Sequence, residues 1–157
     1  MTNDSWTAEQ ATRELMAVLP LLNRIVAAEL RQEAGEDTTM PQFRVLSLLL
    51  EAPITVSAIA KKRRVSLQSA GELVQTLVER GWIERVPDLN DRRQFVLHLT
   101  EVGQAQHQKA QDRMLLRLVP FLEKLSEAEM AAVQVALPAL HRVLVGEEKE
   151  QDSDGSN

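Results

Sequence analysis

Apolar and polar positions alternate with a helical period along the first part of the chain. Thr7-Ala8-Glu9-Gln10 has the form of a capping box, and apolar residues then recur every three or four positions, at Leu15, Val18, Leu19, Leu22, Ile25, Val26 and Leu30. Pro20 removes one backbone donor inside this segment, so we expect a kink or a break near Ala17. Gly35-Glu36-Asp37 is expected to end the helix.

Two shorter helices are predicted next. Thr39-Met40-Pro41-Gln42 is a second capping box with a proline in its first turn, and Pro53 ends the helix that it begins. A short helix is expected over residues 56–64, with Thr55 as its N-cap and with a buried side made of Val56, Ile59 and Ala60.

A fourth helix and a hairpin follow. Ser66 and Ser69 can cap the helix, Gly81 stops it, and its apolar positions fit a period of 3.6, at Leu73, Val74, Leu77 and Val78. Residues 82–86 and 95–99 alternate as strands do. Because the loop between them is polar and contains proline and aspartate, the pattern predicts a β-hairpin.

The last third of the chain is predicted to be helical again. Thr100 can cap a long helix that reaches toward Leu125, and Ser126 with Glu129 forms a capping box for a last helix that ends near Gly146. The predicted fold is therefore mainly α with a small β-hairpin: a winged helix-turn-helix plus terminal dimerisation helices.

The expected domain organisation has three parts. Residues 39–100 form the winged helix-turn-helix, residues 1–38 and 101–146 form a helical dimerisation region, and the acidic tail over 147–157 is expected to be disordered.

The terminal helices carry more apolar surface than one small winged domain can cover. A partner helix would bury it, and an intrachain bundle is the alternative; the residues are Val18, Leu19, Leu22, Met114, Leu115, Leu118, Val119, Leu122, Leu125, Met130, Val133, Val135, Leu137, Leu140, Val143 and Leu144.

Composition narrows the class of protein. A chain of 157 residues has room for one core, and the absence of cysteine excludes disulfides, thiolate zinc sites and thiol-based redox sensing. The first residues lack a basic start followed by an apolar run, and no later stretch approaches 18 uninterrupted apolar residues. We therefore expect a cytoplasmic protein.

Charge is distributed unevenly along the chain. The net charge is −5, yet residues 54–100 carry eight basic and five acidic side chains, so their net charge is +3 and that of the flanks is −8. The basic residues Lys61, Lys62, Arg63 and Arg64 precede the predicted turn, where they can reach phosphates. The alternative is a solvated helix end, because cations are favoured at a helix C-terminus.

Two helices with a tight turn and a hairpin suit duplex DNA, because a helix fits the major groove while a thin ribbon reaches the backbone and minor groove. From Thr39 to Gly103 the chain resembles the MarR family of bacterial regulators. The matching segments are Thr39–Leu46, Val65-Ser66 with Leu73-Val74 and Leu77–Ile83, and Asp88–Gly103. The resemblance implies a dimer with intertwined terminal helices, an operator that is often palindromic, and a repressor whose DNA affinity a small-molecule effector modulates.

The wing carries the most specific part of the resemblance. By carry-over of its Asp-x-Arg pattern, Arg93 would enter the minor groove, Asp91 would hold its guanidinium by a bidentate pair, and Arg92 would contact phosphate. An arginine of fixed orientation suits the negative potential of a narrow minor groove. A surface ion pair that shapes the turn is the alternative.

The chain departs from the family in its helix-turn-helix. The family commonly has leucine and glycine where Arg63 and Arg64 stand, and it usually has basic residues where Leu67, Glu72 and Thr76 stand. Gly71 costs up to about 1 kcal/mol of helix propensity. Base reading would then fall to Ser66, Gln68, Ser69 and Gln75, with Gln68 best suited to adenine, while Glu72 accepts from cytosine or faces solvent.

Other sites receive less support. By resemblance, an effector crevice could be lined by Asn23, Phe43, Arg44 and Leu46, although packing is the more common role for the apolar ones. The three histidines lack metal-ligand spacing, and no phosphate loop or nucleophile motif occurs, so no cofactor, metal or enzymatic activity is expected. The alternative to a DNA-binding regulator is a winged-helix module for protein interaction.

Overall fold

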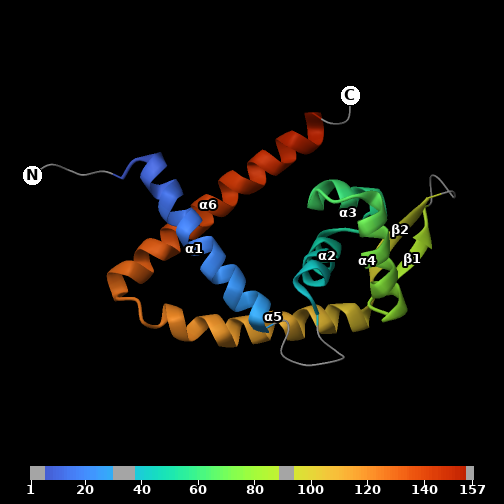
Figure 1. Ribbon diagram of the computed structural model, residues 1–157, viewed down its shortest axis with the longest axis horizontal. Helices are drawn as coiled ribbons and strands as arrows, with labels where there is room; N and C mark the ends of the chain where they lie inside the picture. Colours follow the sequence, from blue (N-terminus) through green and yellow to red (C-terminus); the bar gives the residue numbers. More distant parts are fainter. Residues whose placement is uncertain (1–5, 30–37, 89–93, 155–157) are drawn as a thin grey trace, which may run out of the picture. The chain divides into compact units, whose positions relative to one another are not determined.

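The computed structural model describes residues 6–29, 38–88 and 94–154. The chain divides into two compact units, residues 1–117 and residues 118–157. Its elements, shown in Figure 1, are α1 (Ala8–Glu29), α2 (Met40–Glu51), α3 (Val56–Arg63), α4 (Leu67–Glu79), β1 (Ile83–Pro87), β2 (Phe95–Leu99), α5 (Glu101–Leu122) and α6 (Glu127–Asp154). The predicted fold class, mainly helical with one hairpin, is confirmed.

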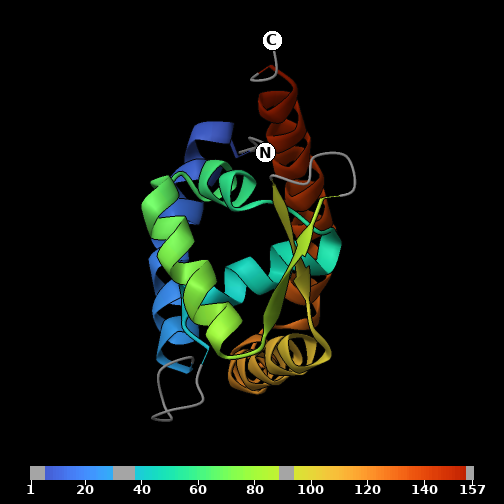
Figure 2. The same cartoon turned by 90° about the vertical axis from the view of Figure 1, so that its right-hand side faces the viewer.

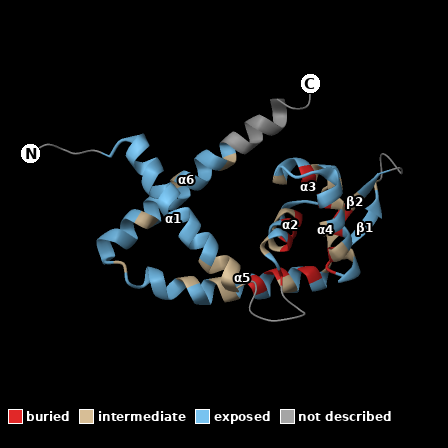
Figure 3. Ribbon diagram, in the orientation of Figure 1, coloured by how far each residue is buried: buried red, intermediate tan, exposed pale blue. Residues whose placement is uncertain are grey.

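The core of the first unit lies between α2, α3, α4 and the hairpin. The side chains buried there come from each of these elements, as the red segments of Figure 3 show, and they are Val45, Leu46, Leu49, Ile59, Ala60, Ala70, Val74, Leu77, Trp82, Ile83 and Leu97. Nearly all of them stand at the apolar positions that the helical and strand periods predict. The winged helix-turn-helix therefore buries an apolar core of its own.

The hairpin is a two-stranded antiparallel sheet in which Ile83 pairs with Leu99 and Pro87 with Phe95. Its two strands are seen alongside each other in Figure 2, and β1 contacts α4. The Leu97 amide also donates to the Ile54 carbonyl at 2.9 Å, which joins the chain before α3 to the sheet. The predicted hairpin is confirmed, with its first strand shifted by one residue.

The first half of α5 packs on the winged core of its own chain. The Gly103 amide donates to the Thr100 hydroxyl at 3.0 Å, which confirms Thr100 as the N-cap, and the same hydroxyl donates to the Gly81 carbonyl at 2.6 Å. A Cβ built on Gly103 would lie 1.9 Å from the Trp82 carbonyl oxygen. Only glycine allows α5 to lie this close to the turn after α4.

A buried histidine joins α5 to α2. The His107 ring stacks on Phe43 with centroids 4.4 Å apart, and its Nε2 lies 2.8 Å from the Ser47 hydroxyl oxygen. Because that hydroxyl donates to the Phe43 carbonyl, His107 Nε2 is the donor to Ser47. Burial disfavours the imidazolium and lowers the pKa of His107.

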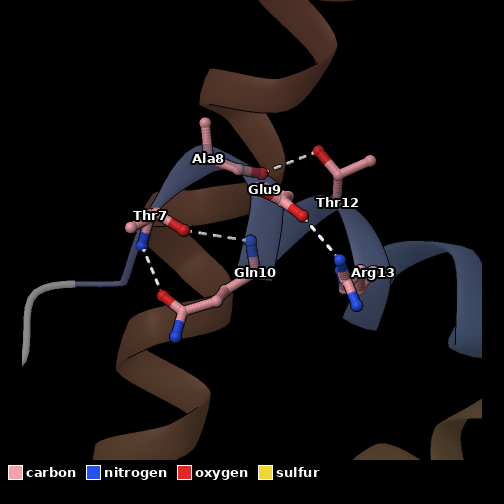
Figure 4. A network of polar contacts seen from close by, with 6 residues as sticks. All are labelled: Thr7, Ala8, Glu9, Gln10, Thr12 and Arg13. Atoms are coloured by element: carbon pink, nitrogen blue, oxygen red, sulfur yellow. Dashed lines mark hydrogen bonds and ion pairs between the residues drawn. The ribbon is translucent and has the colours of Figure 1, made fainter.

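The N-terminal helix α1 begins at the predicted capping box. The Thr7 amide donates to the Gln10 side chain at 2.8 Å and the Gln10 amide donates to the Thr7 hydroxyl at 3.2 Å, as Figure 4 shows. The helix runs unbroken through Pro20, so the expected break is absent. Its expected end at residues 35–37 lies outside the described residues.

The last helix is longer than predicted. Ser126 and Glu129 form the expected capping box, and the hydrogen bonds from Ser126 lower the pKa of Glu129. Helix α6 continues beyond Gly146 to Asp154, so the expectation that the acidic tail is disordered from residue 147 is wrong for its first eight residues. The physical reason is the helix propensity of Glu, Lys and Gln, which fill residues 147–151.

Candidate nucleic-acid interface

Helices α3 and α4 form the helix-turn-helix, and an unusual residue stands in the turn. The Arg64 amide donates to the Lys61 carbonyl and the Val65 amide donates to the Ala60 carbonyl, each at 3.1 Å, in the pattern of a Schellman motif. Arg64 adopts a left-handed conformation with φ of 52°, which glycine adopts at far lower cost. The chain therefore makes this turn without the glycine of the family pattern.

The basic residues before the turn differ in exposure. Lys61, Lys62 and Arg64 are exposed at the C-terminal end of α3, whereas Arg63 is half-buried. Desolvation lowers the pKa of Arg63, and the neighbouring Arg44 guanidinium lowers it further. Three of the four predicted phosphate-binding side chains are thus exposed, while Arg63 takes the more buried place.

The N-terminus of α4 is fixed by its own serines. The Ser69 amide donates to the Ser66 hydroxyl oxygen at 3.1 Å, and the Ser66 hydroxyl donates to the Ser69 hydroxyl at 2.9 Å. This confirms Ser66 as the N-cap. Since these bonds occupy the Ser66 hydroxyl, this side chain has little capacity left to contact a base.

The outward face of α4 carries a row of four polar side chains. They are exposed, they are spaced by four, three and four residues, and they are Gln68, Glu72, Gln75 and Glu79. Ala70, Val74 and Leu77 are buried on the opposite side. The row contains two carboxylates and no cation. Sequence reasoning singled out the glutamines but missed the row, which the i, i+4 spacing indicates.

Each glutamine in this row is bonded to the glutamate that follows it. Gln68 Nε2 donates to Glu72 Oε1 at 3.0 Å, and Gln75 Nε2 donates to Glu79 Oε1 at 2.9 Å. A carboxylate only accepts hydrogen bonds, so each amide must turn its nitrogen toward the acid. The two pairs fix the orientation of the amides on this face.

The wing is described only at its base. The Asp88 amide donates to the Gln94 carbonyl at 3.0 Å and closes the loop. The predicted tip residues Asp91, Arg92 and Arg93 lie outside the described residues. Their roles stay predictions.

The predicted effector residues occupy different environments. Asn23 and Arg44 are exposed on α1 and α2, and Phe43 is half-buried against His107. Leu46 is fully buried in the core, so it packs and lines no surface crevice. Within the described residues no group of three or more histidine or acidic side chains could hold a metal ion.

The fold and this interface define a winged helix-turn-helix protein, and comparison with known proteins identifies its family. Residues 36–94 match the family model described as MarR family. The HTH-type transcriptional regulator YfiV of Bacillus subtilis is 36% identical over 115 residues, which cover 73% of this chain and 72% of YfiV. The multiple antibiotic resistance protein MarR of Escherichia coli is 39% identical over 70 residues, 44% of this chain and 49% of that protein.

A solved structure gives the same result. RV1404 from Mycobacterium tuberculosis superposes with a TM-score of 0.75 at 26% identity, covering 88% of this chain and 95% of that one. The chain belongs to the MarR family of winged helix-turn-helix proteins. It is a DNA-binding transcriptional regulator and not an enzyme.

Proposed function

We propose that the protein is a sequence-specific repressor that binds a palindromic operator as a homodimer. The observation that carries this proposal is the placement of three exposed basic side chains, Lys61, Lys62 and Arg64, directly before an exposed helix N-terminus. In this arrangement α4 enters the major groove while the end of α3 contacts the phosphates that flank it.

Affinity and selectivity then come from different residues. The basic residues of α3, with Arg92 and Arg93 of the wing, supply contacts to phosphate and minor groove. Gln68 and Gln75 read base edges, because an amide offers the donor and acceptor that adenine presents. With an acidic outward face on α4, phosphate contacts must supply most of the affinity.

The proposal of a homodimer is supported by apolar surface on α6. Met130, Val133, Leu137, Leu140 and Leu144 are spaced three and four residues apart in alternation, the pattern of a helix seam that packs on another helix. Of these five side chains none is buried within the chain. We infer that a second copy of the chain covers this seam.

A membrane is the other environment that such a helix suits. By length and composition alone, Glu127–Gly146 is long and apolar enough to cross a bilayer, and none of it is buried. The seam favours a partner helix instead, since lipid selects no particular face. We therefore keep a cytoplasmic location as part of the proposal, and membrane fractionation of cells expressing the full chain tests it.

An effector of anionic character fits the surface of α2. Arg44 is exposed, and it lies close enough to Arg63 to affect its pKa. Two neighbouring guanidinium groups favour the binding of an anionic ligand. We propose that such a ligand, held by Arg44, lowers the affinity for the operator.

The salt dependence of DNA binding tests the proposed function. In a mobility-shift titration with the full chain, the logarithm of the DNA-binding constant should fall linearly with the logarithm of the salt concentration. Each phosphate that the protein neutralises should add about 0.9 to the steepness of this slope. Replacing both Lys61 and Lys62 by alanine should reduce the slope by about 2 and weaken binding to all sequences alike. Lys109→Ala, which removes an exposed charge from α5, is the matched control and should leave the slope unchanged.

A protein-interaction module is the second candidate, and the acidic row on α4 favours it. Replacing Arg92 and Arg93 by alanine separates the two functions. A DNA-binding repressor should lose affinity for every duplex, whereas an interaction module should show weak binding to duplex DNA that the substitutions leave unchanged.

A further inference from the structure

The Gln68–Glu72 pair on α4 places a fixed carboxylate where the proposed function puts a base. Glu72 is exposed in the second turn of the helix, opposite the buried Ala70, Val74 and Leu77. Its Oε1 accepts from Gln68 Nε2 at 3.0 Å. N-terminal residues of a recognition helix are the ones that contact base edges.

A carboxylate in the major groove discriminates strongly between bases. Cytosine presents an amino donor there and adenine presents one beside an acceptor, whereas guanine and thymine present the acceptor oxygens O6 and O4. Glu72 only accepts, so opposite guanine or thymine it would lose its water without gaining a partner, and it would face another acceptor. Such a mismatch excludes bases by repulsion.

We propose that Glu72 is a specificity-determining residue that restricts the base it faces to cytosine or adenine. This inference rests on the proposed function, because it requires α4 to enter the major groove. The bond to Gln68 is compatible with it. Gln68 gives one amide hydrogen to Glu72 and keeps its second hydrogen and its Oε1 for adenine N7 and N6.

The chain supplies a matched control in Glu79. It lies on the same face, is exposed, and accepts from Gln75 at 2.9 Å in the same i, i+4 arrangement. Seven residues separate Glu72 and Glu79, which corresponds to about 10 Å along the helix. Glu79 therefore has the charge and the local bonding of Glu72 but stands in the last turn, away from the base-reading end.

Selection of bound sites from random duplex DNA, with the full chain and its variants Glu72→Gln and Glu79→Gln, tests the inference. The wild type should enrich sites in which one position of each half-site admits cytosine or adenine and excludes guanine and thymine. Glu72→Gln should lose this exclusion, with discrimination at that position falling about tenfold in binding assays on single-base variants of the enriched duplex. Glu79→Gln should keep it.

Both substitutions remove one negative charge and retain an acceptor for the neighbouring glutamine. Both should therefore tighten binding to unrelated DNA to a similar extent. If Glu72→Gln enriches the same bases as the wild type at every position, the inference is wrong and the proposed function stands. If the wild type enriches no sequence, both are overturned.

Discussion

At the scale of single residues, the left-handed turn residue between α3 and α4 is the clearest departure from the lowest-energy choice. Two consecutive helices end in the same motif, α3 with Arg64 at φ of 52° and α4 with Gly81 at φ of 68°. A left-handed L-residue costs about 1–2 kcal/mol, and glycine recovers part of this at an entropic cost of about 0.5–1 kcal/mol. Arg64→Gly should therefore raise the free energy of unfolding by about 1 kcal/mol, measured by urea denaturation.

A second variant separates the effect of losing the Arg64 charge from the effect of relieving the left-handed backbone. Arg64→Ala removes the same guanidinium but keeps the left-handed cost, so it should be less stable than Arg64→Gly by about 1 kcal/mol. Equal stabilities of the two variants would mean that the turn stores no backbone strain. Arg64 is also a candidate phosphate contact, so both variants would also change DNA binding. The comparison is therefore made on folding stability alone.

Local signals at single residues were predictable from the sequence, and close approaches between distant residues were not. Thr7, Thr39 and Ser126 cap their helices as their motifs predict, since a capping box involves only residues three apart. The need for glycine at position 103 depends on the Trp82 carbonyl, which is far away in sequence. No pattern within α5 reveals such a neighbour.

At the scale of elements, His107 makes the contact between α2 and α5 sensitive to pH. Its pKa is lowered by burial, so the folded chain favours the neutral ring, while the unfolded chain titrates near the ordinary value of about 6.5. Below that value the unfolded state binds more protons. Folding stability contributed by His107 is therefore present above about pH 6.5 and is lost as the pH falls toward the lowered pKa.

Substitution of His107 by glutamine should flatten this dependence. Glutamine can still donate to Ser47 but does not titrate, so the unfolding free energy of His107→Gln should change less than that of the wild type between about pH 7 and pH 5.5. Ser47→Ala is the control: it removes the acceptor, lowers stability at every pH and keeps the dependence. Parallel curves for the wild type and His107→Gln would show that another group titrates.

Predictions about elements succeeded where a period is repeated and failed where a single residue was given too much weight. The helices of the winged core were predicted because apolar residues such as Val74 and Leu77 recur on one face and are buried there. Pro20 was expected to kink or break α1, and the break is absent because the helix continues through it. Gly146 was expected to end α6, yet the helix formers that follow extend it.

The candidate site was predictable in its location but not in its polarity. The basic end of α3 follows from four consecutive charges, and the base-reading glutamines follow from their place on α4. Hydrogen bonds join Gln68 to Glu72 and Gln75 to Glu79, so each glutamine stands in a pair that carries a negative charge. Single-residue reasoning assigned a role to each side chain separately and therefore missed the row that they form.

At the scale of the whole molecule, the chain has a buried core in its winged region and exposed apolar faces on its long helices. Exposed large apolar side chains are concentrated on α1, the second half of α5 and α6, which are largely pale blue in Figure 3. Large apolar side chains gathered on exposed helix faces in this way mark an interface. A two-fold dimer would cover it and would also place two copies of α4 about one turn of DNA apart.

The seam on α6 allows a specific test of this dimer. Leu137 and Leu140 lie on the seam, whereas Val135, two residues before Leu137, lies on the opposite side of the helix and is more exposed than either. Leu137→Glu with Leu140→Glu should place two carboxylates in an apolar interface and give a monomer in sedimentation at micromolar concentration. Val135→Glu should remain a dimer.

Operator binding should change with the oligomeric state. A monomer engages one half-site and loses the effective concentration that links the two, so the double variant should bind a two-half-site duplex about 100-fold more weakly than the wild type, while Val135→Glu binds normally. A monomeric wild type would contradict the two-fold proposal outright. A double variant that stays dimeric would instead place the interface on α1 and α5, because those helices carry most of the remaining exposed large apolar side chains.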